Sequence, residues 1–189
     1  MSQSASRGFE TRERILSAGK KVIFEKGFHS SRVSDITRKA GLAHGTFYIY
    51  FPAKEYLLLE LLKTVREEML NLIDNGIEKI REGKVKEGKN QVFIEPFRLM
   101  MREKELAKIF FFEAICSSKK FQDFYREGKE VFYQKTVSAL SLINHPKPDI
   151  LAHIILGTAR HLIESYILTG KEVEALWVKV LKELGVLHF

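Results

Sequence analysis

Apolar residues recur at intervals of three and four positions along most of the chain, which is the spacing of one face of an α-helix. No segment alternates apolar and polar residues in the manner of a half-buried strand. We therefore predict an all-α protein. The predicted helices cover residues 9–26, 32–40, 44–50, 52–80, 90–102, 104–117, 121–142, 149–168 and 172–184.

The segment 31–55, SRVSDITRKAGLAHGTFYIYFPAKE, predicts two short helices joined by a tight turn. Its apolar residues have the spacing that two crossed helices need to share a small core. They are Val33, Ile36, Ala40, Leu42, Phe47 and Phe51. Gly41 can adopt a positive φ at the turn, and the cations Arg38 and Lys39 suit the negative end of the preceding helix. This pattern predicts a helix-turn-helix that binds DNA.

The second short helix is expected to expose a compact set of polar and aromatic residues that could face a DNA groove. These residues are His44, Gly45, Thr46, Tyr48 and Tyr50. Lys54 follows Pro52 in the first turn of a long helix, where free amides and a cation suit a phosphate; the alternative is a solvated surface lysine. Ser31 is a candidate helix cap, and its hydroxyl could instead contact a phosphate.

The formal charge of +7 is concentrated in the first quarter of the chain. Residues 1–55 hold ten Lys or Arg against five Asp or Glu, and the remaining residues hold twenty-one against nineteen. Localised positive charge favours nucleic-acid binding, although it could also serve only solubility. We expect a DNA-binding domain over residues 1–55, with residues 1–8 mobile, and a second helical domain over 56–189 that contains a loop at 82–89.

Features of the sequence also point to a cellular compartment. No apolar run approaches the ~20 residues that span a bilayer, and the polar start lacks the apolar segment of a secretory signal. The single cysteine, Cys116, lies in an apolar run, where a buried and inert thiol is expected. We therefore expect a cytoplasmic protein with no membrane partner.

Residues 41–58, GLAHGTFYIYFPAKEYLL, resemble the tetracycline-repressor (TetR) family of bacterial transcription regulators. The family pattern joins a Gly-hydrophobic turn, a small-Thr-aromatic-Tyr helix, an aromatic pair ending in Phe, and a Lys-Glu-x-Leu helix start. Here these elements are Gly41-Leu42, Gly45-Thr46-Phe47-Tyr48, Tyr50-Phe51 and Lys54-Glu55-Tyr56-Leu57. The resemblance covers roughly residues 9–65.

The resemblance implies roles for most residues of the second short helix and for Lys54 after it, with Phe47 and Phe51 as core residues. Contacts with phosphates or base edges are implied for Thr46, Tyr48, Tyr50 and Lys54. His44 and Gly45 would lie against the major groove, and His44, at a variable position of the family, is expected to discriminate sequence. Two residues depart from the family pattern. Ala43 replaces the usual Ser or Thr cap, at a cost of about 1 kcal/mol, and Thr37 replaces an alanine, which would loosen the packing slightly.

The resemblance further implies that the second domain senses a small molecule. Its cavity is expected among helices rich in aromatic residues and methionine, a composition suited to an apolar ligand. The candidate lining residues are Phe97, Met100, Met101, Phe110, Phe111, Phe132 and Tyr133, with His161 and Glu164 as polar groups. The alternative for each is an ordinary core residue. His161 and Glu164 have helical metal-ligand spacing, but no third ligand accompanies them, so we predict no metal and no cofactor.

The last two predicted helices are apolar over so much of their surface that other helices must cover them. We predict an intersubunit four-helix bundle with two helices from each chain; a purely internal core is the alternative. The candidate interface residues are Leu151, Ile155, Leu162, Tyr166, Leu176, Trp177, Val180 and Leu184.

These features predict a homodimeric, ligand-responsive regulator that binds double-stranded DNA. The simplest form is a repressor that a small apolar or amphipathic effector releases from a palindromic operator. A transcriptional activator and a helical adaptor for a protein partner are the alternatives. The chain has no glycine-rich phosphate loop, nucleophile motif or set of metal ligands, so we do not predict an enzyme.

Overall fold

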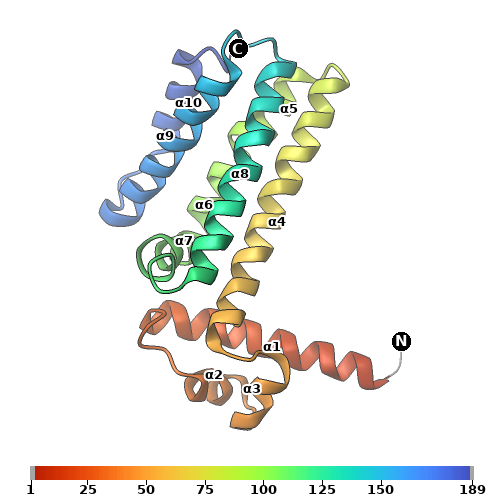
Figure 1. Ribbon diagram of the computed structural model, residues 1–189, viewed down its shortest axis with the longest axis vertical. Coiled ribbons are helices and arrows are strands. Elements are labelled where there is room, and N and C mark those ends of the chain that lie inside the picture. The colour runs from red at the N-terminus through yellow and green to blue at the C-terminus, as the bar shows by residue number, and fades with distance from the viewer. Residues whose placement is uncertain (1–2, 188–189) are drawn as a thin grey trace. The chain divides into compact units, whose positions relative to one another are not determined.

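The computed structural model describes residues 3–187, and all regular elements in that range are helices (Figure 1). They are α1 (Gln3–Lys26), α2 (Val33–Ala40), α3 (His44–Tyr50), α4 (Lys54–Arg81), α5 (Val85–Phe93), α6 (Glu95–Arg102), α7 (Lys104–Ile109), the π-helical turn η1 (Phe110–Ala114), α8 (Lys119–Leu142), α9 (Pro148–Thr169) and α10 (Glu174–Glu183). The predicted all-α fold is confirmed.

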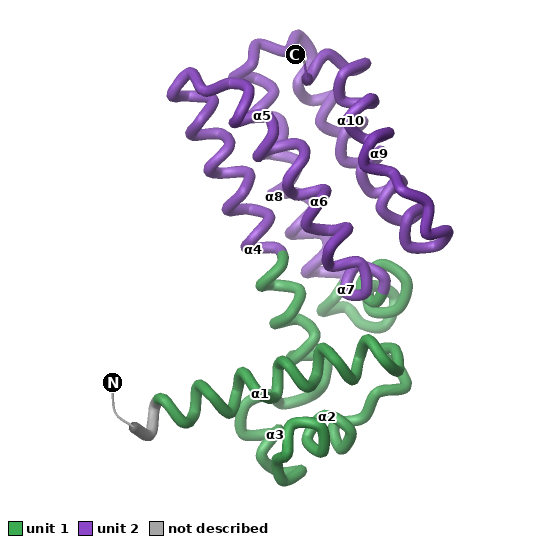
Figure 2. The backbone as a smooth tube through the Cα atoms, turned by 180° about the vertical axis from the view of Figure 1, so that it is seen from behind, with its two compact units in different colours: residues 1–65, 109–121 green, residues 66–108, 122–189 purple. Residues whose placement is uncertain are grey.

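Contacts within the chain divide it into two compact units (Figure 2). Unit 1 consists of residues 1–65 and 109–121, and unit 2 of residues 66–108 and 122–189. The boundary expected after residue 55 falls inside unit 1, because the first turns of α4 belong to the core of that unit. A Cβ at Gly19 of α1 would lie 2.7 Å from the Leu57 side chain of α4, so the two helices approach closely there.

The core of unit 1 forms around α1. Ile15, Val22 and Ile23 of this helix are almost fully buried. Ile36 of α2 and Phe47 of α3 are buried in the same core. Both belong to the apolar pattern that predicts the helix-turn-helix. Apolar burial of this kind holds the two short helices in place, because seven or eight residues do not form a stable helix alone.

Helix α1 begins earlier than the apolar pattern predicts. The expected start was residue 9, whereas the helix starts at Gln3. Local side-chain bonds support the extra turns: Ser6 Oγ donates to Glu10 Oε1 at 3.2 Å, and Thr11 Oγ1 donates to the Arg7 carbonyl at 2.8 Å. Residues 3–8 of the segment predicted to be mobile are helical, and residues 1 and 2 lie outside the described part; the mobility of this segment stays a prediction.

The predicted loop at 82–89 is wrong from Val85 onward, where α5 begins. The two glycines taken as loop residues have different roles. Gly83 ends α4 with a φ of +83°, whereas Gly88 packs against Gly76 of α4. A Cβ on Gly88 would lie 2.5 Å from the Gly76 carbonyl oxygen, so α4 and α5 cross with their backbones in contact. Gly88 therefore serves helix packing and not chain reversal.

Unit 2 packs α6 against the C-terminal helices through an aromatic pair. The Phe97 and Trp177 rings stack with centroids 5.1 Å apart, and Trp177 Nε1 donates to the Phe93 carbonyl at 2.8 Å. Arg98 of α6 donates to Glu174 of α10 from both Nε and Nη2, at 2.8 and 2.7 Å. The apolar stack and the ion pair therefore join the same two helices.

Residues 109–117 differ from the single apolar helix expected there. The helix widens into the π-helical turn η1 before it ends, and Cys116 just beyond it is exposed. The prediction that this thiol is buried is therefore wrong.

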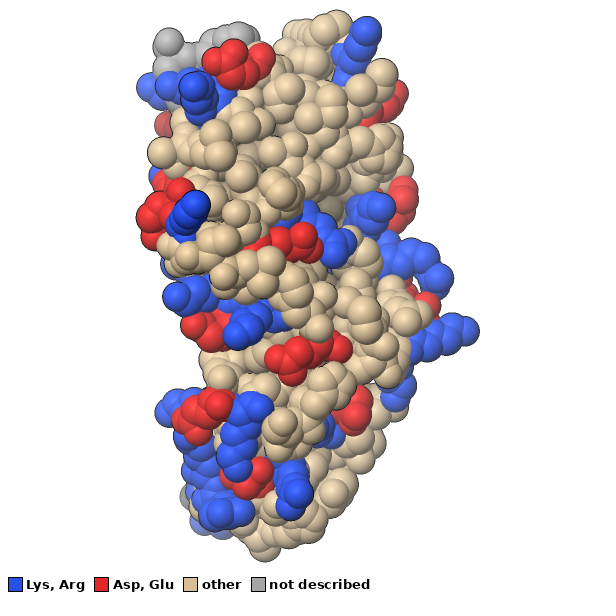
Figure 3. Space-filling model, turned by 90° about the vertical axis from the view of Figure 1, so that its left-hand side faces the viewer, with Lys and Arg blue, Asp and Glu red and all other residues tan. Residues whose placement is uncertain are grey.

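Charged residues of both signs are interspersed on the face drawn in Figure 3, between uncharged side chains. The net positive charge therefore does not form one continuous basic surface on that face, and any DNA-binding role must be argued from particular residues. Among residues 3–187, no helix is both long enough and apolar enough to cross a membrane.

Candidate nucleic-acid interface

The turn between α2 and α3 has the geometry that its glycine predicts. Gly41 adopts a left-handed conformation with φ 64° and ψ 41°, its amide donates to Arg38 O at 3.1 Å, and the next amide donates to Thr37 O. Arg14 of α1 also donates to the Ala40 carbonyl at 2.7 Å, which fixes the end of α2. Sequence reasoning missed Arg14, because nothing local to the turn points to it.

Thr37 fits its buried position in α2. Its hydroxyl donates back to the carbonyls of Val33 and Ser34 at 3.2 and 3.3 Å, so the polar group has partners inside its own helix. Its burial requires no partner from another element.

Helix α3 presents most of the predicted residues to solvent. His44, Gly45 and Tyr48 are exposed, and Thr46 and Tyr50 are half-buried. The His44 and Tyr48 rings meet edge to face at 5.6 Å, so they form one surface. Ile49 is also exposed and was absent from the prediction, although its position two residues from the buried Phe47 placed it on the outer face.

The start of α3 lacks a side-chain cap, as the sequence predicts. Ala43 occupies the N-cap position and makes no side-chain hydrogen bond. Its backbone carbonyl accepts a hydrogen bond from the Thr46 amide at 3.0 Å. The remaining free amides of this turn are available to water or to an anion.

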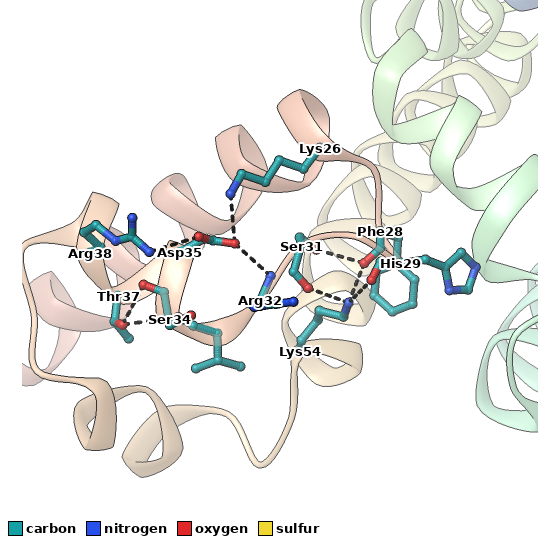
Figure 4. A network of polar contacts seen from close by, with 11 residues as sticks. Lys26, Phe28, His29, Ser31, Arg32, Ser34, Asp35, Thr37, Arg38 and Lys54 are labelled. Atoms are coloured by element: carbon teal, nitrogen blue, oxygen red, sulfur yellow. Dashed lines mark hydrogen bonds and ion pairs between the residues drawn. The ribbon is translucent and has the colours of Figure 1, made fainter.

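The start of α2 is held by a charge network and not by the predicted serine cap (Figure 4). Arg32 occupies the N-cap position, and its amide donates to Asp35 Oδ2 at 3.3 Å. Asp35 also pairs with Lys26 at 3.0 Å and with Arg38 at 3.2 Å. The hydrogen bond from Lys26 is the main cause that lowers the pKa of the Asp35 carboxyl.

Ser31 and Lys54 bond to the protein itself. Ser31 is 2% exposed and its hydroxyl donates to the Phe28 carbonyl at 2.8 Å, so its predicted phosphate contact is corrected to an internal one. The Lys54 ammonium donates to the carbonyls of Phe28, His29 (3.4 Å) and Ser31 (2.8 Å), and burial lowers its pKa. These three bonds use all three ammonium donors, so Lys54 can offer a phosphate its charge more readily than a hydrogen bond.

A shallow depression of about 510 Å³, widely open to solvent, lies beside α3. Its lining brings together the starts of α2 and α4 with two side chains of α3. The lining residues are Ser31, Arg32, Val33, Ser34, His44, Tyr48, Pro52, Ala53, Lys54 and Glu55. Three predicted residues, His44, Tyr48 and Lys54, therefore lie around one depression, and the almost fully buried Ser31 lies beneath them. Helix starts offer amides and a partial positive charge, which suit a phosphate of a DNA backbone.

The segment 109–121 contacts the helix-turn-helix from the middle of the chain. Glu113 of η1 accepts a hydrogen bond from the Phe28 amide at 2.7 Å, and the Phe121 ring meets the Phe28 ring edge to face at 5.7 Å. Lys120 lies 3.7 Å from the centroid of the Tyr56 ring at the start of α4. Sequence reasoning did not predict these contacts, because no local pattern links residues so far apart.

The predicted effector-binding residues are distributed over both units. Phe110 and Phe111 lie in unit 1, and the other seven lie in unit 2. Phe97 stacks on Trp177, and Glu164 pairs with Arg160 at 2.7 Å. The remaining candidates differ in exposure. Met100, Met101, Phe132 and Tyr133 are half-buried, and His161 is exposed. Phe97 thus fits the alternative of an ordinary core residue, and effector contacts of the others stay a prediction.

The predicted dimer-interface residues are corrected in part. Leu151, Ile155, Leu162 and Trp177 are buried within the single chain, so they are core residues. Tyr166, Val180 and Leu184 are half-buried, and Leu176 is exposed. The exposed side of α9 carries a different set, which the apolar pattern alone could not separate from the core set. It includes Ile150, Ile154, Gly157, His161 and Leu168.

Comparison with known proteins gives family matches over most of the chain. Residues 15–61 match the family described as bacterial regulatory proteins, tetR family, and residues 83–187 match the tetracyclin repressor-like C-terminal domain. The chain is 29% identical over 174 residues to the uncharacterized HTH-type transcriptional regulator YdgC of Bacillus subtilis. The aligned region covers 87% of this chain and 85% of the relative.

Two solved structures are similar to this chain over almost their whole length. A transcriptional regulator (TerR/AcrR family) from Aquifex aeolicus has 31% identity and a TM-score of 0.75, with coverage of 93% of this chain and 98% of that chain. The FadR regulator of Bacillus subtilis in complex with stearoyl-CoA has 26% identity and a TM-score of 0.72, with coverage of 93% and 99%. The helix-turn-helix geometry, both family matches and these relatives lead to one conclusion: the chain belongs to the tetracycline-repressor (TetR) family and is a DNA-binding transcriptional regulator.

Proposed function

We propose that this protein is a homodimeric repressor that leaves a palindromic operator when it binds a small amphipathic effector. The observation that carries the proposal is the exposed face of α3 beside the depression lined by the starts of α2 and α4. In this proposal the protein acts on DNA in the cytoplasm and has no catalytic activity.

The DNA contacts divide between base edges and the backbone. His44, Gly45 and Tyr48, which are exposed, face the major groove. Thr46 and Tyr50 contact phosphates, and Lys54 adds positive charge beside the depression. Ser31 supports the loop from inside and does not touch DNA.

The dimer forms through the exposed side of α9 together with Leu176 of α10. Apolar side chains on this side include Ile150, Ile154 and Leu168, with exposed fractions of 59, 44 and 68%. Burial of such residues against a second copy is favourable, and Gly157 between them leaves room for a close approach. A two-fold dimer would place its two recognition helices about 34 to 36 Å apart to match successive major grooves.

The proposed effector carries a long acyl chain and a polar head. Support comes from the similarity to FadR, which was solved with stearoyl-CoA, and from the aromatic and methionine side chains of the predicted effector set. Release from DNA then requires that the effector bind the DNA-free conformation more tightly than the DNA-bound one.

Selection of duplexes from a random library by the full-length protein tests the proposal. We expect a palindromic site, a footprint of two half-sites, and weaker binding by Tyr48→Ala and His44→Ala but not by Lys63→Ala, which alters an exposed lysine elsewhere on α4. Stearoyl-CoA should release the duplex, and free coenzyme A should not. Failure to select any duplex would contradict the proposed DNA-binding role. If neither compound releases the duplex, the proposal of an acyl effector is wrong. Activated transcription from the selected site would favour the activator.

A further inference from the structure

Helix α3 turns one large apolar side chain directly away from its own core. Phe47 is fully buried and marks the inward face of the helix. Gly45 and Ile49 are each two positions from Phe47, and about 100° per residue places both on the opposite, outward face. Ile49 is 77% exposed, the largest fraction among the large apolar side chains of the described residues.

The surroundings of Ile49 leave its methyl groups uncovered. Gly45 lies one turn earlier on the same face, and a Cβ built there would meet nothing within 4 Å. His44 and Tyr48 turn toward the depression at the helix starts, whereas Ile49 is not part of its lining. The face that carries Ile49 thus lies outside the lining of the depression and stays open to a base edge. Its β-branched side chain is stiff, so a contact would cost little rotamer entropy.

We propose that Ile49 reads a thymine in each half-site through the C5 methyl group. This inference rests on the proposed function, since it requires α3 to enter the major groove. An isoleucine has no donor or acceptor for base edges, and thymine is the base that presents a methyl group there. Gly45 allows the helix backbone to approach the bases closely enough for the contact.

The test uses the duplex that the wild-type protein selects. Each thymine of the half-site is replaced in turn by deoxyuridine, which removes only the methyl group and keeps base pairing. We expect one position at which this change weakens wild-type binding about 4-fold for one half-site and about 15-fold for both. Ile49→Ala should weaken binding to the thymine duplex, and it should bind the thymine and deoxyuridine duplexes equally. Val85→Ala, which shortens an exposed apolar residue of α5, should keep the wild-type response.

The outcomes separate this inference from the proposed function. If the wild type selects a duplex but no deoxyuridine position weakens it, the Ile49 contact is overturned and the DNA-binding role stands. The same holds if Ile49→Ala retains the full deoxyuridine effect. If the wild type selects no duplex, the proposed function fails and the inference fails with it.

Discussion

Glu113 accepts a hydrogen bond from the backbone amide of Phe28 at 2.7 Å, across 85 positions of sequence. The bond links η1, in the middle of the chain, to the loop that joins α1 and α2. The same carboxylate favours the charged form of Lys54, which bonds to carbonyls of that loop. The loop that leads into the helix-turn-helix is therefore held in part by a side chain from outside the motif, Glu113.

Loss of the Glu113 carboxylate should weaken this link. Glu113→Ala leaves the Phe28 amide without its acceptor, so we expect the free energy of unfolding to fall by about 1 to 3 kcal/mol. Hydrogen exchange at the Phe28 amide should become faster, and Glu113→Gln, which keeps an acceptor, should restore part of the protection. Glu105→Ala, at an exposed position of α7, serves as the control. Unchanged exchange in Glu113→Ala would contradict the assignment.

Lys54 is expected to contribute to stability as well as to DNA affinity. Lys54→Met keeps an unbranched side chain that is one atom shorter and removes the three donors, which leaves the carbonyls of Phe28, His29 and Ser31 without this partner. We expect a loss of about 2 kcal/mol in urea unfolding. Lys63→Met should have little effect. A Lys54→Met protein as stable as the wild type would show that water replaces the ammonium.

The charge network of Asp35 predicts a pH dependence. The folded-state pKa of this carboxyl is lowered below its ordinary value of 3.8, first by the hydrogen bond from Lys26. Its stabilising contribution is therefore complete above that ordinary value and is lost as the pH falls through the lower folded-state pKa. Between about pH 5 and pH 2, the wild type should lose stability more steeply than Asp35→Asn. Glu67→Gln, at an exposed position, should show the same pH dependence as the wild type. If the stability of Asp35→Asn falls with pH in parallel with that of the wild type, Asp35 does not cause the pH dependence.

The crossing of α4 and α5 makes Gly88 intolerant of a side chain. A Cβ there would lie 2.5 Å from both the Gly76 carbonyl oxygen and Ile80 Cγ1, so Gly88→Ala must push the helices apart. We expect a loss of about 1 to 3 kcal/mol in the free energy of unfolding. Gly128→Ala is the matched control in α8, since its Cβ meets only Arg66 Cδ at 3.7 Å. That variant should gain about 0.5 to 1 kcal/mol. Equal behaviour of the two variants would argue against the close crossing.

The proposed dimer face can be tested at Ile154. A carboxylate at this exposed position leaves the core of the chain intact but introduces like charges into a two-fold contact. Ile154→Asp should therefore sediment as a monomer and retain its thermal stability as a folded protein at low concentration. Val85→Asp should remain dimeric. If Ile154→Asp remains dimeric, the proposal that the dimer forms through α9 is wrong.

The sequence alone determined the helical class, the helix-turn-helix and the TetR family, because each depends on signals between neighbouring residues. The three- and four-residue periodicity, the glycine turn and the uncapped start at Ala43 are all such local signals, and the structure confirms them. The exposed Ile49 was also within reach of this reasoning, since its distance from Phe47 fixes its face.

Only the tertiary structure decided which side of each apolar helix is covered, and by what. Leu151, Ile155, Leu162 and Trp177 turn into the chain. Gly88 meets Gly76, and Glu113 reaches Phe28, through pairings that depend on how distant helices pack. Ser31 and Lys54 carry groups suited to a phosphate, yet their partners are the carbonyls of a nearby loop. The physical reason is that periodicity records how apolar a helix face is, whereas its partner depends on the arrangement of the whole chain.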